Sequence, residues 1–328
     1  MLKYLFATSS IIYGLYLISA IKSVPNVCKT LKDYKTIRHN PNCWYNPDVG
    51  ATPRQIATRY GFPFESHEIT TEDGYIISLF RIPHNGTDIN RKRPPILLQH
   101  GFGADAANWM VSGLQSIVFV FSNYGYDIWM SNSRGSKYSV KHMRYTIYDL
   151  QFWDFSFHEI AIYDIPAIID FIKTETGKKN KIIYIGHSMG TSISYVYASL
   201  KPEDAVNNLK SIVSLAPIAY MDHIAPFAKV LAPFHNMFWN IFKSVGFYGV
   251  GPNIQFVLNL IHSVCSSSNF IQICSDAAGI AMGKNDEELV ASALPIEPPE
   301  YPLTRIKVPI HLFYGRNDPL STEKVNEV

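Results

Sequence analysis

The feature that most constrains the fold is a series of short apolar segments separated by stretches of helical periodicity. A strand at 76–81 comes first and is expected at a sheet edge; the later strands are expected at 95–99, 126–130, 181–185, 211–215 and 309–314. Between them, residues 155–173 carry apolar side chains at helical spacing, and Pro166 is expected to kink or restart that helix. Apolar strands that alternate with helices are typical of a sheet buried on both faces. The sequence therefore predicts an α/β fold with a mostly parallel sheet flanked by helices.

Composition excludes several other classes of protein. The chain of 328 residues is 47% hydrophobic and 17% charged, which is enough apolar material for a large core. Its net charge of +2 supplies no basic field, so we expect no nucleic-acid partner. No cysteine or histidine spacing is typical of a metal site. We expect neither a metal nor a cofactor.

The amino terminus indicates the compartment. Lys3 precedes an apolar stretch over residues 4–21, which predicts a signal peptide over 1–22. The same stretch is just long enough for a membrane anchor, although its polar residues favour cleavage. Entry into the secretory route implies a secreted or lysosomal protein. In that route Asn85, in Asn-Gly-Thr, is a glycosylation acceptor.

Four cysteines allow three disulfide pairings. Proximity in the sequence favours Cys28 with Cys43 and Cys265 with Cys274, since each pair brackets a short segment rich in turn residues. Free buried thiols are the alternative. An oxidising compartment favours the disulfides.

A long insertion divides the predicted sheet. Residues 216–308 separate two strands, which is far more than a crossover needs, so they predict a subdomain. Its first half is apolar and aromatic. That composition fits an ordinary helical core, and it also fits a cap or lid whose apolar underside lines a site for an apolar ligand. The expected organisation is therefore a first core segment at 23–215, the insertion at 216–308 and an incomplete second core segment at 309–328.

The segment most suggestive of chemistry is Gly186-His187-Ser188-Met189-Gly190. It follows one predicted strand and opens a helix predicted over 191–200, which is the strand–turn–helix context of a nucleophile elbow. Glycine is needed two residues either side of the serine because larger side chains there would collide. A glycine-rich turn with a solvated serine is the alternative. The context favours Ser188 as a nucleophile whose hydroxyl projects from the sheet.

A serine nucleophile also needs donors for the oxyanion that forms on attack. One is expected to be the backbone N–H of Met189, at the start of the helix. The other is expected in the loop His100-Gly101-Phe102-Gly103, where Gly101 lets the backbone turn inward and Phe102 supplies the N–H. His100 itself is expected to make a structural hydrogen bond rather than to act in catalysis.

The acid of a catalytic triad is expected after a late strand. Asp318 stands in this position, directly after the strand predicted over 309–314. Asp222 is the alternative, because it follows the strand predicted over 211–215, but it falls inside the insertion. We therefore favour Asp318.

Several motifs together resemble those of the acid lipase family, the gastric and lysosomal lipases and their insect relatives within the α/β-hydrolase fold. The matching segments are Asn46-Pro47-Asp48-Val49, Tyr60-Gly61-Phe62-Pro63, Thr71-Glu72-Asp73-Gly74-Tyr75, Leu98-Gln99-His100-Gly101 with Asn108-Trp109, Asn132-Ser133-Arg134-Gly135, Phe152-Trp153 with Phe155-Ser156-Phe157, and Tyr163-Asp164-Ile165-Pro166-Ala167. The resemblance extends from about residue 43 to the last residue.

The resemblance implies an α/β-hydrolase fold and hydrolysis of neutral lipid esters, either triacylglycerols or sterol esters, in acidic surroundings. It implies a lipid-droplet or membrane surface as the partner. It also implies that Cys265 and Cys274 are bonded within the cap. Members of the family typically have Gln where this chain has Met189, which leaves the backbone donor in place.

The resemblance fails at the carboxyl end. The family's catalytic histidine follows the acid after one more strand, whereas no histidine follows Asp318 and the last one is His311. We therefore expect the general base and the last strand to be missing from the printed chain, as in a truncated product. Two hypotheses follow: a serine ester hydrolase in its complete form, or a catalytically inactive lipid-binding protein.

Overall fold

The computed structural model describes residues 28–30, 33, 36–37, 39–48, 50–83, 94–177, 182–219 and 301–314. The chain forms two compact units, Met1–Pro47 with Pro252–Asp286, and Asp48–Gly251 with Glu287–Val328. In the described part of the first unit, a disulfide joins Cys28 to Cys43, which confirms that pairing. All the strands of the sheet belong to the second unit.

Several expectations lie outside the described residues: the signal peptide at 1–22, Asn85, Asp222, the pair Cys265 and Cys274, Asp318, and all but the ends of the insertion. Within the described ranges, none of the helices has both the length and the apolar character needed to cross a membrane.

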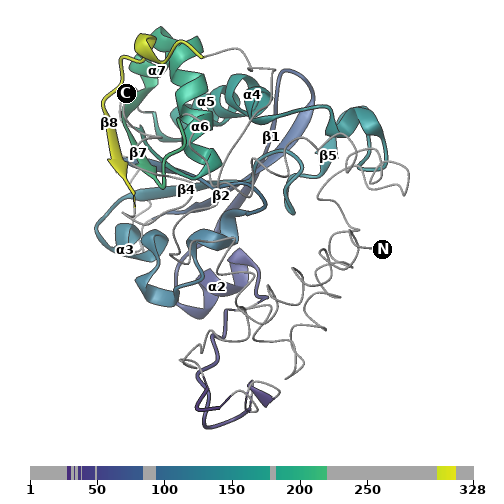
Figure 1. Ribbon diagram of the computed structural model, residues 1–328, viewed down its shortest axis with the longest axis vertical. Coiled ribbons are helices and arrows are strands. Elements are labelled where there is room, and N and C mark those ends of the chain that lie inside the picture. Colours follow the sequence, from purple (N-terminus) through teal and green to yellow (C-terminus); the bar gives the residue numbers. More distant parts are fainter. Residues whose placement is uncertain are drawn as a thin grey trace, which may run out of the picture. The chain divides into compact units, whose positions relative to one another are not determined.

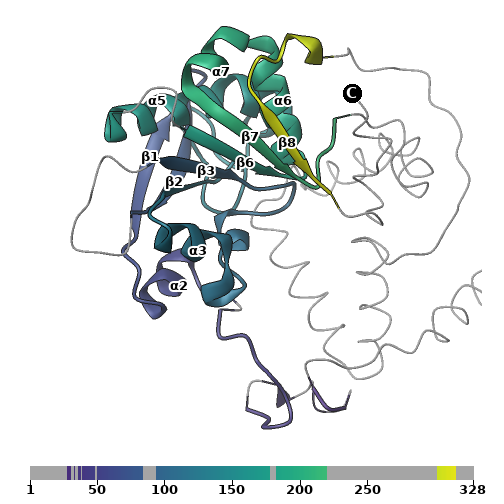
Figure 2. The same ribbon diagram turned by 90° about the vertical axis from the view of Figure 1, so that its left-hand side faces the viewer.

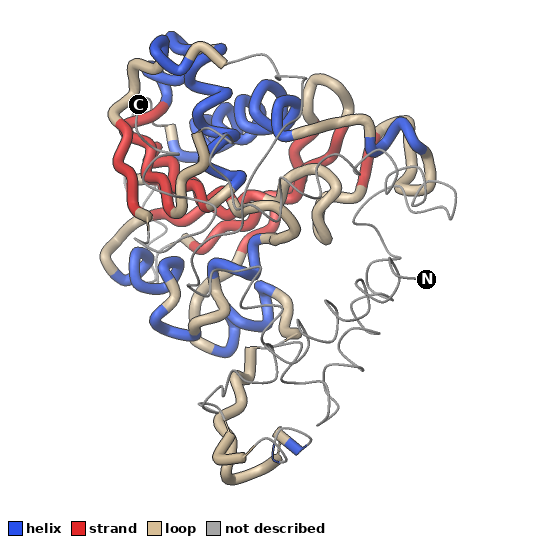
Figure 3. Tube along the Cα trace, in the orientation of Figure 1, coloured by secondary structure: helices blue, strands red, loops and turns tan. Residues whose placement is uncertain are grey.

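The second unit is built on a twisted sheet (Figures 1 and 3). Its strands are β1 (Glu65–Thr70), β2 (Tyr75–Ile82), β3 (Pro95–Gln99), β4 (Asp127–Ser131), β5 (Lys141–His142), β6 (Ile182–His187), β7 (Leu209–Leu215) and β8 (Ile310–Phe313). Their order is β1-β2-β4-β3-β6-β7-β8, and β5 pairs with β2. The run from β4 to β8 is parallel, while β1 and β5 pair antiparallel with β2, which is itself antiparallel to β4. The mostly parallel sheet is confirmed.

Helices cover both faces of this sheet (Figure 2). One face carries α5 (Ile165–Thr176), α6 (Met189–Leu200) and α7 (Pro202–Asn208), together with the short α4 (Phe157–Glu159) and the π-helix η5 (Ile160–Asp164). The other face carries α2 (Pro53–Arg59), α3 (Ile117–Asn123) and the 3₁₀ helices η2 (Ala106–Trp109) and η3 (Gly113–Gln115). Two further 3₁₀ helices are η4 (Leu150–Trp153) and η7 (Leu303–Arg305).

Successive residues of the central strands enter two different cores. Leu97 and Trp129 pack in the core beneath α5 and α6, whereas Leu98 and Met130 pack in the core beneath α2 and α3. All four side chains are fully buried. This division follows from the two-residue period of a strand, which sends neighbouring side chains to opposite faces. Strands buried on both faces need continuous apolar runs, and β3 and β4 have them.

One expectation about the sheet was wrong. The strand predicted at 76–81 is β2, but it lies inside the sheet between β1 and β4 rather than at an edge. The strand β1, which ends the sheet on that side, was not predicted. Its sequence, Glu-Ser-His-Glu-Ile-Thr, has a single buried residue, so it lacks the apolar alternation that identifies a strand.

Candidate active site

The predicted elbow is present between β6 and α6. Ser188 stands between the last residue of β6 and the first residue of α6, with φ 52° and ψ −121°. A non-glycine residue in that region of backbone space is strained, and such strain occurs where the surrounding structure fixes a functional side chain. Ser188 is half-buried and the preceding His187 is exposed. The chain therefore presents Ser188 at the carboxyl edge of the parallel strands.

The two flanking glycines are required by space, as the sequence indicated. A Cβ on Gly186 would lie 2.6 Å from the carbonyl oxygen of Gly190. A Cβ on Gly190 would lie 2.4 Å from the carbonyl oxygen of Gln99, at the end of β3. Both obstacles are backbone atoms, which cannot rotate away. The turn is thus closed against the neighbouring strand as well as against itself.

Further hydrogen bonds hold the elbow. The Ser188 N–H donates to the Leu215 carbonyl at 3.0 Å, and the Ser188 carbonyl accepts from the N–H of Thr191 at 2.8 Å. The hydroxyl of Tyr184, buried beneath the turn, donates to the Gly190 carbonyl at 2.8 Å. The serine is therefore tied to β7 on one side and to its own helix on the other.

The loop that follows β3, residues 100–103, lies close to Ser188. An ideal Cβ on Gly101 would lie 3.1 Å from the Ser188 Cβ and 3.2 Å from the His187 carbonyl oxygen. Glycine at this position therefore allows the loop backbone to approach the nucleophile candidate closely. The next residue, Phe102, has a side chain that is 78% exposed. The structure thus brings Gly101 and its loop to Ser188.

Met189 is the first residue of α6 and is half-buried. The N–H groups in the first turn of a helix have no partner within the helix, and they carry its positive dipole. They can stabilise negative charge that develops beside Ser188. No side-chain group of Met189 is needed for this, because only the backbone N–H would take part.

His100 makes the structural hydrogen bonds expected of it. It is buried, its Nδ1 lies 2.8 Å from the Gly101 carbonyl oxygen, and the N–H of Ser133 donates to its Nε2 at 3.1 Å. These partners require a neutral imidazole with the proton on Nδ1. Burial lowers the pKa of His100 from its ordinary value, which keeps the ring neutral.

The sequence did not reveal the polar contacts beneath that loop. The Gln99 side chain accepts from the Ser131 hydroxyl at 2.6 Å and donates to the Ser133 hydroxyl at 2.8 Å. The serines are more than 30 positions from Gln99, so no local pattern pairs them. Gln99 and Ser133 stand in motifs shared with the resembled family, whereas Ser131 stands in none of them. Within the described ranges, no cluster of His, Cys, Asp and Glu is arranged to hold a metal ion.

Comparison with known proteins agrees with this geometry. Residues 53–113 match a family model described as a partial alpha/beta-hydrolase lipase region, and residues 94–249 match one described as the alpha/beta hydrolase fold. A solved structure of an esterase from Pyrococcus furiosus aligns with a TM-score of 0.45 and 18% identity over 84% of this chain and 76% of that chain. That likeness is too low to add to the assignment.

The curated relatives are more similar. Gastric triacylglycerol lipase of Rattus norvegicus is 37% identical over 75% of this chain and 62% of its own length. The Homo sapiens protein of the same name is 36% identical over 76% and 63%, and lysosomal acid lipase/cholesteryl ester hydrolase of Macaca fascicularis is 34% identical over 76% and 63%. The chain spans about three fifths of the length of these relatives. By its elbow, its sheet order and these matches, the chain belongs to the acid lipase family of the α/β hydrolases.

Proposed function

We propose that the full-length protein is a serine ester hydrolase of the acid lipase type, with Ser188 as its nucleophile. The observation that supports this most is the strained Ser188 between β6 and α6, with the Gly101 loop against it. A structural turn has no need for a strained serine at a sheet edge, whereas acyl transfer needs a projecting hydroxyl with donors beside it.

In the proposed mechanism, the Ser188 hydroxyl attacks the ester carbonyl while a histidine takes its proton, and Asp318 orients that histidine. The backbone N–H groups of Phe102 and Met189 hold the oxyanion of the tetrahedral intermediate. The intermediate collapses, the alcohol leaves with the proton from the histidine, and an acyl-enzyme remains. Water, deprotonated by the same histidine, then attacks the acyl-enzyme and releases the carboxylic acid and Ser188.

The names of the relatives, which include triacylglycerol lipase and cholesteryl ester hydrolase, support a substrate class. We propose neutral lipid esters, triacylglycerol or sterol ester, taken from a lipid-droplet or membrane surface. The insertion at 216–308 would act as the cap, with Cys265 and Cys274 bonded within it. Secretion or lysosomal targeting after removal of residues 1–22, with Asn85 glycosylated, completes the proposal.

A fluorophosphonate probe tests the nucleophile, because it forms a covalent bond only with an activated serine. The full-length protein is expected to be labelled, and Ser188→Ala to abolish labelling. Ser192→Ala, on the next turn of the same helix, is the matched control and should label normally. The labelled protein should also hydrolyse emulsified triacylglycerol or a sterol ester.

Absence of labelling in a folded, full-length sample would contradict the enzyme proposal. Binding of the same sample to a triacylglycerol emulsion would then support a non-catalytic lipid-binding protein. Labelling that persists in Ser188→Ala would assign the nucleophile elsewhere.

A further inference from the structure

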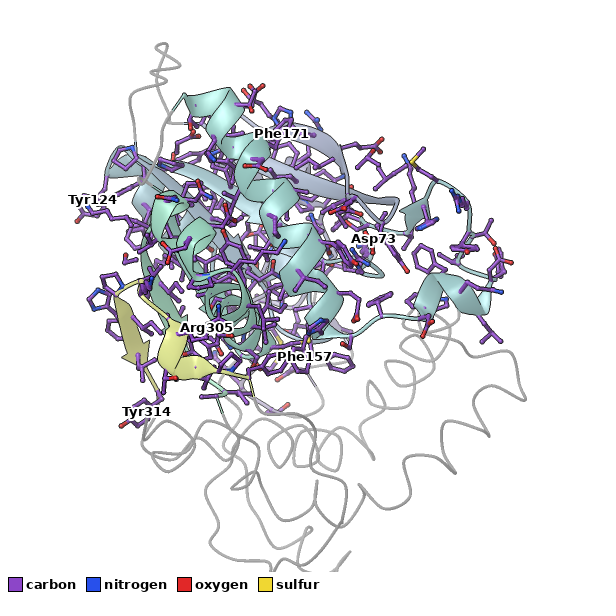
Figure 4. The ribbon with its side chains drawn as sticks, turned by 90° about the horizontal axis from the view of Figure 1, so that it is seen from above. Asp73, Tyr124, Phe157, Phe171, Arg305 and Tyr314 are labelled. Carbon is purple, nitrogen blue, oxygen red and sulfur yellow. A yellow bond between two sulfur atoms is a disulfide. The ribbon has the colours of Figure 1, made fainter. Side chains whose placement is uncertain are left out.

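A buried cluster of charges lies next to the motif that supports His100. The Arg134 side chain is 1% exposed and lies between two carboxylates. Its terminal nitrogens donate to Asp73 at 2.5 and 2.9 Å, while its Nε and Nη2 donate to Asp164 at 2.9 and 2.5 Å. The ring of Tyr75 lies 3.9 Å from the guanidinium carbon. Figure 4 labels Asp73 together with Phe157 of α4 and Phe171 of α5, the two helices on either side of η5.

The three charged residues come from three different elements. Asp73 is in the turn between β1 and β2, Arg134 is in the segment after β4, and Asp164 ends the π-helix η5. The backbone N–H of Arg134 also points to Asp164, at 3.3 Å. Both the side chain and the backbone at position 134 are therefore fixed by the same carboxylate.

The residue before Arg134, Ser133, connects this cluster to the active-site loop. Ser133 donates its N–H to His100, and His100 in turn contacts the carbonyl oxygen of Gly101. Gly101 packs against Ser188. A continuous series of buried contacts thus leads from Arg134 to the loop that we propose to hold the oxyanion.

A buried ion cluster is poor evidence for a stabilising role, because removing charges from water costs about as much as their attraction returns. Its use must be sought in what it positions. We propose that Arg134, clamped by Asp73 and Asp164, is a positioning residue for the oxyanion loop and acts on it through Ser133 and His100. The inference rests on the proposed function of Ser188 and Phe102.

The two carboxylates differ in the pH range over which they stay charged. Burial raises the pKa of Asp164 to about 6, although Arg134 opposes that effect. Burial also acts on Asp73, but hydrogen bonds from Arg134 and Thr71 outweigh it and lower the pKa of Asp73 below its ordinary value. Asp73 therefore remains a carboxylate at pH values where Asp164 has taken up a proton. Arg134 keeps a charged partner throughout that range.

Two further titratable groups face the cluster: His142, whose Nε2 lies 3.1 Å from the Asp73 carbonyl oxygen and whose ring packs against Tyr75, and Asp154, which raises the pKa of Tyr75. Arg134 is also approached by the rings of Phe155 and Tyr163, each 5.8 Å from its guanidinium carbon. The pKa of Tyr75 is raised to about 12, mainly by burial. At the other end of the series, His100 is influenced by Asp105 and His187. Its lowered pKa keeps it neutral.

The chain offers a matched control, a second buried arginine between carboxylates. Arg81 donates to Asp127 at 2.8 and 3.0 Å and to Glu65 at 3.1 Å, and it lies over the ring of Trp129 at 4.6 Å. Asp127 begins β4, so this cluster is at the amino-terminal edge of the parallel strands, opposite Ser188. Its chemistry is the same, but its partners among the described residues are Asp127, Glu65 and Trp129, none of which belongs to the oxyanion loop.

The experiment compares Arg134→Lys with Arg81→Lys in the full-length protein, with a soluble ester as substrate. Lysine keeps the charge but loses the fork that bonds both carboxylates. Arg134→Lys is expected to lower kcat about 10- to 100-fold with KM changed less than about twofold, since displaced catalytic groups cost this much. Both variants are expected to lower the thermal midpoint by similar amounts, whereas Arg81→Lys is expected to leave kcat within about twofold of the wild-type value. Equal kcat losses in both variants would overturn the proposal.

Asp73→Asn gives a second test. The Asp73 side chain is 25% exposed, so its replacement is expected to destabilise the fold less than replacement of the buried Arg134. Without Asp73, Arg134 depends on Asp164 alone, so kcat is expected to fall as the pH drops through the raised pKa of Asp164. The wild-type protein and Asp164→Asn, which both retain Asp73, should show only the fall in kcat caused by protonation of the catalytic histidine, so the additional fall in Asp73→Asn is measured against them. Identical pH profiles in Asp73→Asn and the wild type would contradict the proposal.

Two readouts separate this inference from the proposed function. If Ser188→Ala hydrolyses the ester as fast as the wild type, the proposed function is wrong. The ring nitrogens of His100 can be followed by ¹⁵N NMR whether or not the protein is active. Their shifts should change in Arg134→Lys and stay fixed in Arg81→Lys, and the reverse would count against the positioning role.

Discussion

At the scale of single residues, the site depends on three glycines, whose lack of a Cβ atom allows close backbone packing. Gly186, Gly190 and Gly101 each lie so close to backbone or to Ser188 that a Cβ could not be added without movement. None of these three has the positive φ that often explains a glycine. What they provide is room, which allows β3, β6 and α6 to meet at one point.

Gly190→Ala tests this. Gly190 lies in α6, where alanine is normally better than glycine by about 1 kcal/mol. Here the variant is expected to lower the free energy of unfolding by about 3 kcal/mol, because the new Cβ overlaps the Gln99 carbonyl. Gly177→Ala is the control: Gly177 has φ 64° with open space around it, so only backbone strain of about 1 kcal/mol is expected. Urea denaturation measures both; a Gly190→Ala loss no larger than that of Gly177→Ala would show that the contact can relax.

At the scale of elements, the π-helix η5 and the following α5 place Asp164. Pro166, at the second position of α5, has no N–H to donate to the Ile162 carbonyl. That carbonyl instead accepts from the Lys201 ammonium group at 2.8 Å, at the far end of α6. The proline that the sequence predicted to restart the helix thus also creates a contact between two helices.

A double-mutant cycle checks this explanation. Lys201→Met is expected to cost about 1 to 2 kcal/mol of unfolding free energy, since it leaves the Ile162 carbonyl without its donor. In a Pro166→Ala background the restored N–H can bond that carbonyl, so Lys201→Met should cost clearly less there. Additive losses would mean that the lysine acts independently of the proline.

At the scale of the whole second unit, one sheet serves two cores. Leu97 and Leu98 are adjacent and fully buried, yet they belong to different cores. Because the same strands carry both sets of side chains, neither core can be lost without disturbing the other. We expect the described core of this unit to unfold as a single cooperative structure.

Leu97→Ala and Leu98→Ala should each lower the free energy of unfolding by about 2 to 5 kcal/mol. Far-UV circular dichroism and tryptophan fluorescence should report the same transition midpoint for each variant, because the cores unfold together. Leu114→Ala, at a position that is 55% exposed, should change the free energy by less than about 0.5 kcal/mol. Separate midpoints for the two probes would show that the faces unfold independently.

Much of the site's local geometry could be predicted from the sequence alone. The glycines around Ser188, the apolar runs of β3 and β6 and the helical spacing of residues 155–173 are all local patterns, set by backbone sterics and side-chain periodicity. Pro166, at the second position of α5, is another. Such patterns depend on a few neighbouring residues, so they can be identified in the sequence without knowledge of the tertiary structure. The edge strand β1 escaped because its side chains are mostly exposed and leave no apolar pattern.

Only the tertiary structure decided which distant residues meet. The partners of Arg134 lie 61 and 30 positions away, and Ser133 reaches His100 across 33 positions. Hydrogen bonds of this kind depend on strand order and on the register between β3 and β4, and neither is written in any local segment. The sequence determined the elbow and the type of sheet; the packing of β3, β4 and η5 around it decided what supports the elbow, because long-range polar contacts form only when the elements have been brought together.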